Sequence, residues 1–216
     1  MNLANLLTLL RIFFVPLLVA ALVQDNWEFV LRGFVISNES LALAIFLAAA
    51  ATDLLDGYVA RHWGQITTVG TLLDPIADKL LISAALIALV QVRQVPGWMA
   101  ILIIGREFAV TGLRGIAASA GYTIQASDLG KTKMVSQVLA VSLILVSVHW
   151  PQWRFAADVW LWLVVFFSIL SALMYFMKFW RKVDDRIKKR RRRELLIAER
   201  RRKRAVAAAR SEVANS

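Results

Sequence analysis

Four aspartates with helical spacing stand in a strongly apolar part of the chain. Asp53 and Asp56 lie three residues apart, and Asp74 and Asp78 lie four apart, so on helices each pair shares a face. An ionised carboxylate at membrane depth costs about 2.5–3.5 kcal/mol, so such residues are rare and mark functional sites. Four carboxylates that converge also repel one another unless cations lie among them. These aspartates therefore predict a cation-dependent site.

The chemistry of this site follows from its donor atoms. Carboxylate oxygens suit Mg²⁺ or Mn²⁺, and the chain has no cysteine, which excludes thiolate metal sites and disulfides. Four carboxylates exceed what one Mg²⁺ takes while it keeps its waters, which favours two ions. A two-metal site with ions about 3.5–4 Å apart is suited to displacement at phosphorus.

The two aspartate pairs belong to two predicted helices that form a hairpin around Gly64. Asp53 and Asp56 lie eleven and eight residues before this glycine, and Asp74 and Asp78 lie ten and fourteen after it. At a rise of about 1.5 Å per residue, the two pairs reach a similar depth on antiparallel neighbours. Helical geometry thus predicts one cluster of four carboxylates near one end of the hairpin.

Composition and hydropathy predict an all-α, polytopic membrane protein. Of the 216 residues, 59% are hydrophobic, compared with about 45–50% in soluble domains. Several apolar segments approach the roughly 20 residues that span a bilayer. We place these spans at 12–23, 41–61, 67–90, 96–118, 131–150 and 155–178. Residues 2–11 are predicted as a short interfacial helix and residues 24–40 as a polar loop. A signal peptide is the weaker interpretation of the N-terminus, since no basic segment precedes the apolar run.

Positive charge is concentrated after the last predicted span. The formal net charge is +11, and residues 181–216 hold fifteen Lys/Arg and five Asp/Glu, which is +10. Six spans put both termini on one side, and the positive-inside rule makes that side the cytoplasm, with a bacterial inner membrane as the expected location. We predict a transmembrane domain over 1–180 and a basic helical tail over 181–216. The tail either anchors the topology only or attracts anionic lipid head groups; its attachment to a membrane core argues against nucleic-acid binding.

The aspartate stretch resembles the signature of the CDP-alcohol phosphotransferase family, D-x2-D-G-x2-A-R-x8-G-x3-D-x3-D, at every defined position. These positions are Asp53, Asp56, Gly57, Ala60, Arg61, Gly70, Asp74 and Asp78. The resemblance implies six transmembrane helices, often as a homodimer, and a two-metal Mg²⁺ or Mn²⁺ site that faces the cytoplasm. It also implies transfer of a substituted phosphate group from a CDP-linked donor to an alcohol, with release of CMP.

The resemblance also implies roles for the matching residues. The four aspartates would bind the metals, and Asp78 would also be the general base. The CDP group of the donor would be bound by Asp56, Gly57, Ala60, Arg61 and Gly70. Taken alone, the small residues are more typical of close helix packing. The arginine would pair with a carboxylate or a phosphate oxygen.

A second polar stretch indicates which kind of acceptor molecule the protein binds. Arg106 and Arg114 lie in the fourth predicted span, and Lys131 and Lys133 begin the fifth. These cations predict a pocket for a phosphate group on the acceptor. The alternative is that Arg106 pairs with Glu107 or another carboxylate and that the lysines only anchor the topology. Together with the N-terminal NLLTLLR, these runs resemble the bacterial phosphatidylglycerophosphate synthase branch of the family, which implies CDP-diacylglycerol as donor and sn-glycerol 3-phosphate as acceptor.

Other functions remain open at this point. Two related enzymes in the family are alternatives: a cardiolipin synthase, which uses phosphatidylglycerol, and a phosphatidylinositol-phosphate synthase. A lipid acceptor would not need the cationic pocket. A divalent cation transporter would use the aspartates as a transport site, and it predicts metal flux without CMP release. No other sequence feature predicts a path to the outer side of the membrane.

Overall fold

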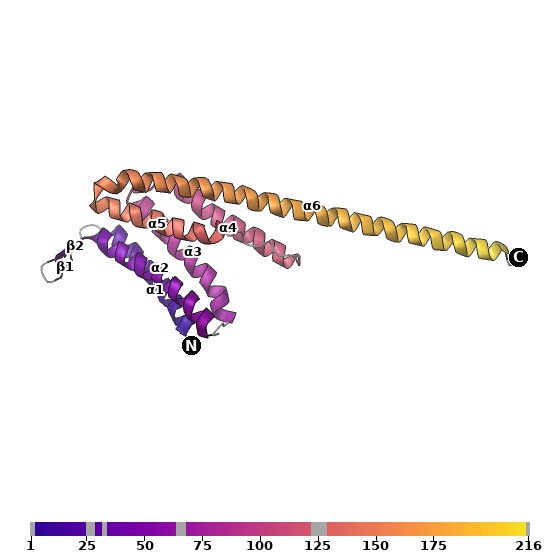
Figure 1. Ribbon diagram of the computed structural model, residues 1–216, viewed down its shortest axis with the longest axis horizontal. Helices are drawn as coiled ribbons and strands as arrows, with labels where there is room; N and C mark the ends of the chain where they lie inside the picture. The colour runs from indigo at the N-terminus through magenta and orange to yellow at the C-terminus, as the bar shows by residue number, and fades with distance from the viewer. Residues whose placement is uncertain (1–2, 25–28, 32–33, 64–67, 122–128, 215–216) are drawn as a thin grey trace. The chain divides into compact units, whose positions relative to one another are not determined.

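The computed structural model describes residues 3–24, 29–31, 34–63, 68–121 and 129–214, which are almost entirely helical (Figure 1). Within these ranges the helices are α1 (Leu3–Val23), α2 (Asn38–Trp63), α3 (Thr68–Gln91), α4 (Gly97–Ser119), α5 (Leu129–His149) and α6 (Arg154–Ala214). A short 3-10 turn, η1 (Pro151–Trp153), precedes α6. The predicted all-α class is confirmed, and each predicted apolar segment corresponds to a helix.

The N-terminal helix differs from the prediction. α1 is one continuous helix, so the predicted division into an interfacial helix over 2–11 and a separate span is wrong. Thr8 and Arg11, whose polarity suggested the interface, are fully buried and lie on one stripe with Val15 and Leu18. α1 packs against α2 and α3. Its polar residues therefore face protein and not the boundary between lipid and water.

The segment predicted as a polar loop over residues 24–40 contains a small hairpin. Strands β1 (Phe29–Leu31) and β2 (Phe34–Ile36) pair in antiparallel register. Both strands consist of apolar and β-branched or aromatic residues, which favour extended structure. The charged residues of the segment hid this pattern, because they dominate its average polarity.

The chain divides into two compact units. The first comprises Met1–Gly112 and Gln125–Ala172, and the second comprises Leu113–Ile124 and Leu173–Ser216. In the first unit, α5 packs against α2 and α3, which also contact α1. Its core contains large buried side chains from most of these helices: Leu18, Phe46, Leu86, Leu89, Ile103, Ile144 and Leu145.

The second unit contains the end of α4 and the C-terminal part of α6. Gly121 has φ +74° just after α4, the left-handed conformation that commonly ends helices. Arg186 of α6 donates through Nη2 to the carbonyl oxygen of Gly121 at 3.2 Å. α6 continues to Ala214, so one helix runs from the last predicted span into residues 181–214. The separate basic tail over 181–216 stays a prediction.

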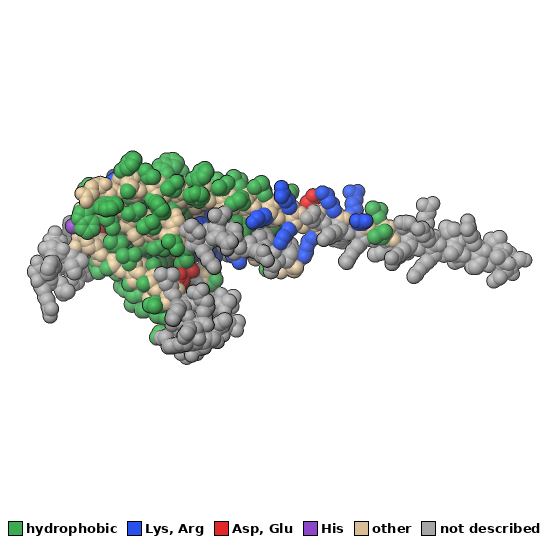
Figure 2. Space-filling view, in the orientation of Figure 1, with side chains coloured by type: hydrophobic (Ala, Val, Ile, Leu, Met, Phe, Trp, Pro, Cys, Tyr) green, Lys and Arg blue, Asp and Glu red, His purple; other side chains and the backbone are tan. Residues whose placement is uncertain are grey.

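Length and hydropathy mark two described helical segments as candidate membrane spans. They are Asn5–Val23 and Pro151–Asp184, and a shorter apolar segment covers Lys133–His149. Apolar side chains gather on the surface shown in Figure 2. The large exposed apolar residues of the first unit include Phe155 and Ile101. Such a surface is suited to lipid. These candidates come from the described residues alone, and a bundle of six spans stays a prediction.

Candidate active site

A buried arginine contacts Asp53 and Asp78, the two of the four signature aspartates whose side chains the structure describes. Arg11 is 0% exposed; its Nη2 lies 3.1 Å from Oδ1 of Asp53, and its Nη1 pairs with Oδ1 of Asp78. The three residues come from α1, α2 and α3, respectively. Because one guanidinium contacts both carboxylates, the two aspartates lie close together across the helix pair. The approach expected from helical geometry is present for these two residues.

The other signature residues lie on the same two helices. Asp56 follows Asp53 by about one turn of α2, and Asp74 precedes Asp78 by about one turn of α3. Their side chains lie outside the described residues. The same applies to the remaining residues predicted for the CDP site, Gly57, Ala60, Arg61 and Gly70. The structure therefore positions these residues along α2 and α3, and their roles stay predictions.

The chemistry of the described pair fits a divalent cation. Asp53 and Asp78 present carboxylate oxygens, which Mg²⁺ and Mn²⁺ prefer. They already hold one positive group, the guanidinium of Arg11, between them. Among the side chains that the structure describes, no three acidic or histidine residues form a metal-binding group. The described pair thus supplies two of the four predicted ligands, and the other two lie beyond the described side chains.

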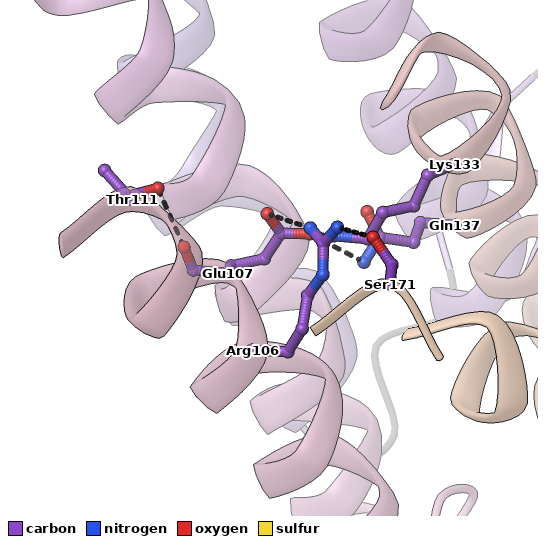
Figure 3. Close-up of polar contacts among 6 residues, drawn as sticks. All are labelled: Arg106, Glu107, Thr111, Lys133, Gln137 and Ser171. Carbon is purple, nitrogen blue, oxygen red and sulfur yellow. Dashed lines mark hydrogen bonds and ion pairs between the residues drawn. The ribbon is translucent and has the colours of Figure 1, made fainter. Parts of the chain in front are cut away.

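A second polar cluster is centred on Glu107 of α4 (Figure 3). Its carboxylate accepts hydrogen bonds from Arg106 Nη1 and from Gln137 Nε2, each at 3.3 Å, and forms an ion pair with Lys133. Arg106 also donates through Nη2 to the hydroxyl of Ser171. Gln137 and Lys133 belong to α5 and Ser171 to α6, so one carboxylate and one guanidinium connect three helices.

This cluster brings together two of the four cations predicted for the acceptor. Arg106 and Lys133 are each only 10% exposed. Both cations contact the single carboxylate of Glu107, and cations of this kind are the groups that bind anions such as phosphate. The pairing of Arg106 with Glu107 also matches the alternative interpretation. Arg114 belongs to the second unit, and the side chain of Lys131 lies outside the described residues.

Comparison with known families decides the relationship that the signature suggested. A sequence model of the CDP-alcohol phosphatidyltransferase family matches residues 1–180. The chain belongs to this family. The match covers every predicted span and ends where the basic tail begins. CDP-alcohol phosphatidyltransferases generally use divalent metal ions, in agreement with the oxygen donors of the aspartate cluster.

Individual relatives of this phosphatidyltransferase carry more specific names. The chain is 43% identical over 192 residues to a CDP-diacylglycerol–glycerol-3-phosphate 3-phosphatidyltransferase of Bacillus subtilis. The aligned part covers 83% of this chain and 95% of the relative. It is 41% identical over 150 residues to a probable phosphatidylglycerophosphate synthase of Mycobacterium tuberculosis, covering 69% of this chain and 68% of the relative. A Rickettsia felis protein with the same name as the Bacillus relative is 33% identical over 181 residues, 81% of this chain and 93% of its own length.

Three residues of this phosphatidyltransferase contribute contacts that the sequence analysis did not predict. For Arg11, the sequence predicted only a place in the interfacial segment over residues 2–11 and no contact with the aspartates. The rule applied to the aspartates, that a charge in an apolar helix needs a partner, holds for Arg11 as well and would have found it. Gln137 and Ser171 carry no comparable signal, because uncharged polar residues are common in the helices of membrane proteins.

Proposed function

We propose that this protein transfers the phosphatidyl group of CDP-diacylglycerol to sn-glycerol 3-phosphate, which forms phosphatidylglycerophosphate and CMP. The observation that carries the proposal is the approach of Asp53 and Asp78 from adjacent helices around one cation. The name of the Bacillus subtilis relative, which contains the same donor and acceptor, supports the proposal. The position of Arg106 and Lys133 together at one carboxylate supports an acceptor that carries phosphate.

The proposed reaction exchanges one phosphorus–oxygen bond for another. The 1-hydroxyl oxygen of the acceptor attacks the phosphorus that bears diacylglycerol, and its proton passes to Asp78. The bond between that phosphorus and CMP breaks, and CMP leaves with the electron pair. Divalent ions bound by the aspartates would neutralise the diphosphate and the charge that develops on CMP. The contribution of the chain itself is positioning and electrostatics.

The acceptor would be held through its phosphate by Arg106 and Lys133. In the structure both cations form ion pairs with the carboxylate of Glu107. These contacts keep the two side chains near each other and largely buried. A dianionic phosphate would add charge-assisted hydrogen bonds to the same two groups. We include Lys131 in this proposed pocket, and Asp56, Gly57, Ala60, Arg61 and Gly70 in the proposed CDP site. Arg114 stays a predicted acceptor-binding residue.

The membrane arrangement is part of the same proposal. The protein would form a homodimer in a bacterial inner membrane, and all six helices of each protomer would span it. The termini and the aspartates would face the cytoplasm. The acyl chains of the donor would stay in the bilayer while its head group enters the site. The tail over 181–216, with its net charge of +10, would attract anionic lipid head groups. Exposed Lys188, Arg191 and Arg192 on α6 support this attraction.

One assay tests the function. Purified full-length protein is given CDP-diacylglycerol and Mg²⁺ or Mn²⁺, and CMP release is measured with glycerol 3-phosphate, glycerol, phosphatidylglycerol or an inositol phosphate. We expect release with glycerol 3-phosphate to exceed release with glycerol by at least about 100-fold, because a site built for a polar group rejects an analogue that lacks it. A preference for phosphatidylglycerol would identify the protein as a cardiolipin synthase. A preference for the inositol phosphate would identify it as a phosphatidylinositol-phosphate synthase. Metal flux without CMP release would assign a transporter.

Lys133→Gln tests the acceptor pocket. We expect the KM for glycerol 3-phosphate to rise about 10–100-fold, because one charge-assisted hydrogen bond is lost and Glu107 keeps its negative charge. The KM for CDP-diacylglycerol is expected to change by less than about twofold. Steady-state CMP release at varied concentrations of each substrate measures both constants.

Lys178→Gln is the matched control, because it removes the same charge from an exposed position on α6. It is expected to leave both constants near wild type. An unchanged acceptor KM in Lys133→Gln, or equal increases for both substrates, would remove Lys133 from the pocket. Arg114→Ala and Lys131→Ala are judged by the same comparison.

A further inference from the structure

Arg11 places a permanent positive charge in a fully buried position of α1. None of its side chain is exposed, and the next residues on its buried stripe, Val15 and Leu18, are apolar. A guanidinium does not lose its proton in proteins, and a buried charge is tolerated only when it is paired. The pairing groups here are Asp53 and Asp78, one from each helix of the hairpin. Three helices therefore meet at one positive charge.

We propose that Arg11 is the built-in counter-ion of the aspartate cluster. In the metal-free protein it neutralises and positions Asp53 and Asp78, and divalent ions take over part of this neutralisation when they bind. The inference rests on the proposed function, in which these carboxylates hold the ions. Both terminal nitrogens of Arg11 contact carboxylates, which favours a positioning role over direct binding of a substrate phosphate.

This role has two opposite electrostatic consequences. Without Arg11, Asp53 and Asp78 repel each other, so the metal-free protein loses the tie among α1, α2 and α3. A divalent ion at the same carboxylates, however, then meets one positive charge fewer and binds more tightly. A residue that only fills space or links helices would show the first consequence without the second.

The test compares Arg11→Gln and Arg11→Lys in purified full-length protein. In EDTA, we expect Arg11→Gln to lower the Tm by roughly 5–15 °C, as for other broken buried ion pairs. With Mn²⁺ alone, at least about half of this deficit is expected to disappear, and the Kd for Mn²⁺, measured by the EPR signal of the free ion, is expected to fall at least about tenfold. Arg11→Lys keeps the charge, so its Kd is expected to stay within about threefold of wild type.

Arg154→Gln is the matched control. Arg154 forms an ion pair with Asp158 at 3.2 Å, outside the aspartate cluster. Its replacement also removes one arginine from an arginine–aspartate pair, and it is expected to leave the Kd for Mn²⁺ unchanged.

Two results would overturn the counter-ion role: a Kd for Mn²⁺ in Arg11→Gln equal to or above wild type, or the same Tm deficit with and without Mn²⁺. If Arg11→Gln does not fold, the double variant with Asp53→Asn is expected to recover folded protein, since it also removes one repelling carboxylate. Failure to recover it would contradict the proposal. Protein that shows these effects but releases no CMP would overturn the proposed function and leave the role of Arg11 intact.

Discussion

Asp78→Asn is expected to lower kcat for CMP release by about 10³–10⁴-fold, the range expected for loss of a general base that also contacts the ions. Asparagine has nearly the same size as aspartate, and its amide oxygen can still accept a hydrogen bond from Arg11. It cannot accept the proton of the acceptor hydroxyl, and it carries no charge for a metal. The measurement is CMP release at saturating CDP-diacylglycerol, glycerol 3-phosphate and Mg²⁺.

Asp158→Asn provides the matched control for this loss. Asp158 lies on α6 and pairs with Arg154, away from the contacts of Arg11. The same chemical change there is expected to leave kcat within about twofold of wild type, since an exposed ion pair contributes little to stability. Thermal unfolding verifies that both variants are folded. A rate near wild type in Asp78→Asn would reject the assigned base.

Removal of divalent ions is expected to lower the rate of CMP release by about as much as Asp78→Asn does. Chelation with EDTA should reduce CMP release at least about 10³-fold, because the carboxylates and the donor diphosphate repel each other when no ion lies between them. Addition of Mg²⁺ or Mn²⁺ in excess should restore the rate. The expected dependence on metal concentration is saturable.

Asp53→Asn shows whether the metal acts at the aspartate cluster. The concentration of Mg²⁺ that gives half-maximal CMP release is expected to rise at least about tenfold, because one charged ligand is replaced by a neutral one. Asp158→Asn should leave this concentration unchanged. Full activity in EDTA would contradict a metal-dependent mechanism, and an unchanged half-maximal concentration in Asp53→Asn would exclude that residue as a ligand.

Helical spacing is a local property, and this is why so much of the site could be predicted. The separations within and between the aspartate pairs, together with one hairpin, require the pairs to reach a similar depth, and the contacts of Asp53 and Asp78 with Arg11 agree with that geometry. The helix positions followed from apolar segments in the same way. The N-terminal division and the hairpin at β1 and β2 were missed because average polarity says nothing about which neighbour covers a polar residue.

The family and the helical class could be predicted from residue types and their spacing, and the same patterns supplied the candidate residues for metal and phosphate. Which charges are partners depended on the packing of the helices in three dimensions. Arg11 lies 42 residues before Asp53 and 67 before Asp78, and Glu107 contacts Lys133 of a different helix. Such pairs depend on how helices rotate and pack against one another, and no spacing rule within a single helix contains that information.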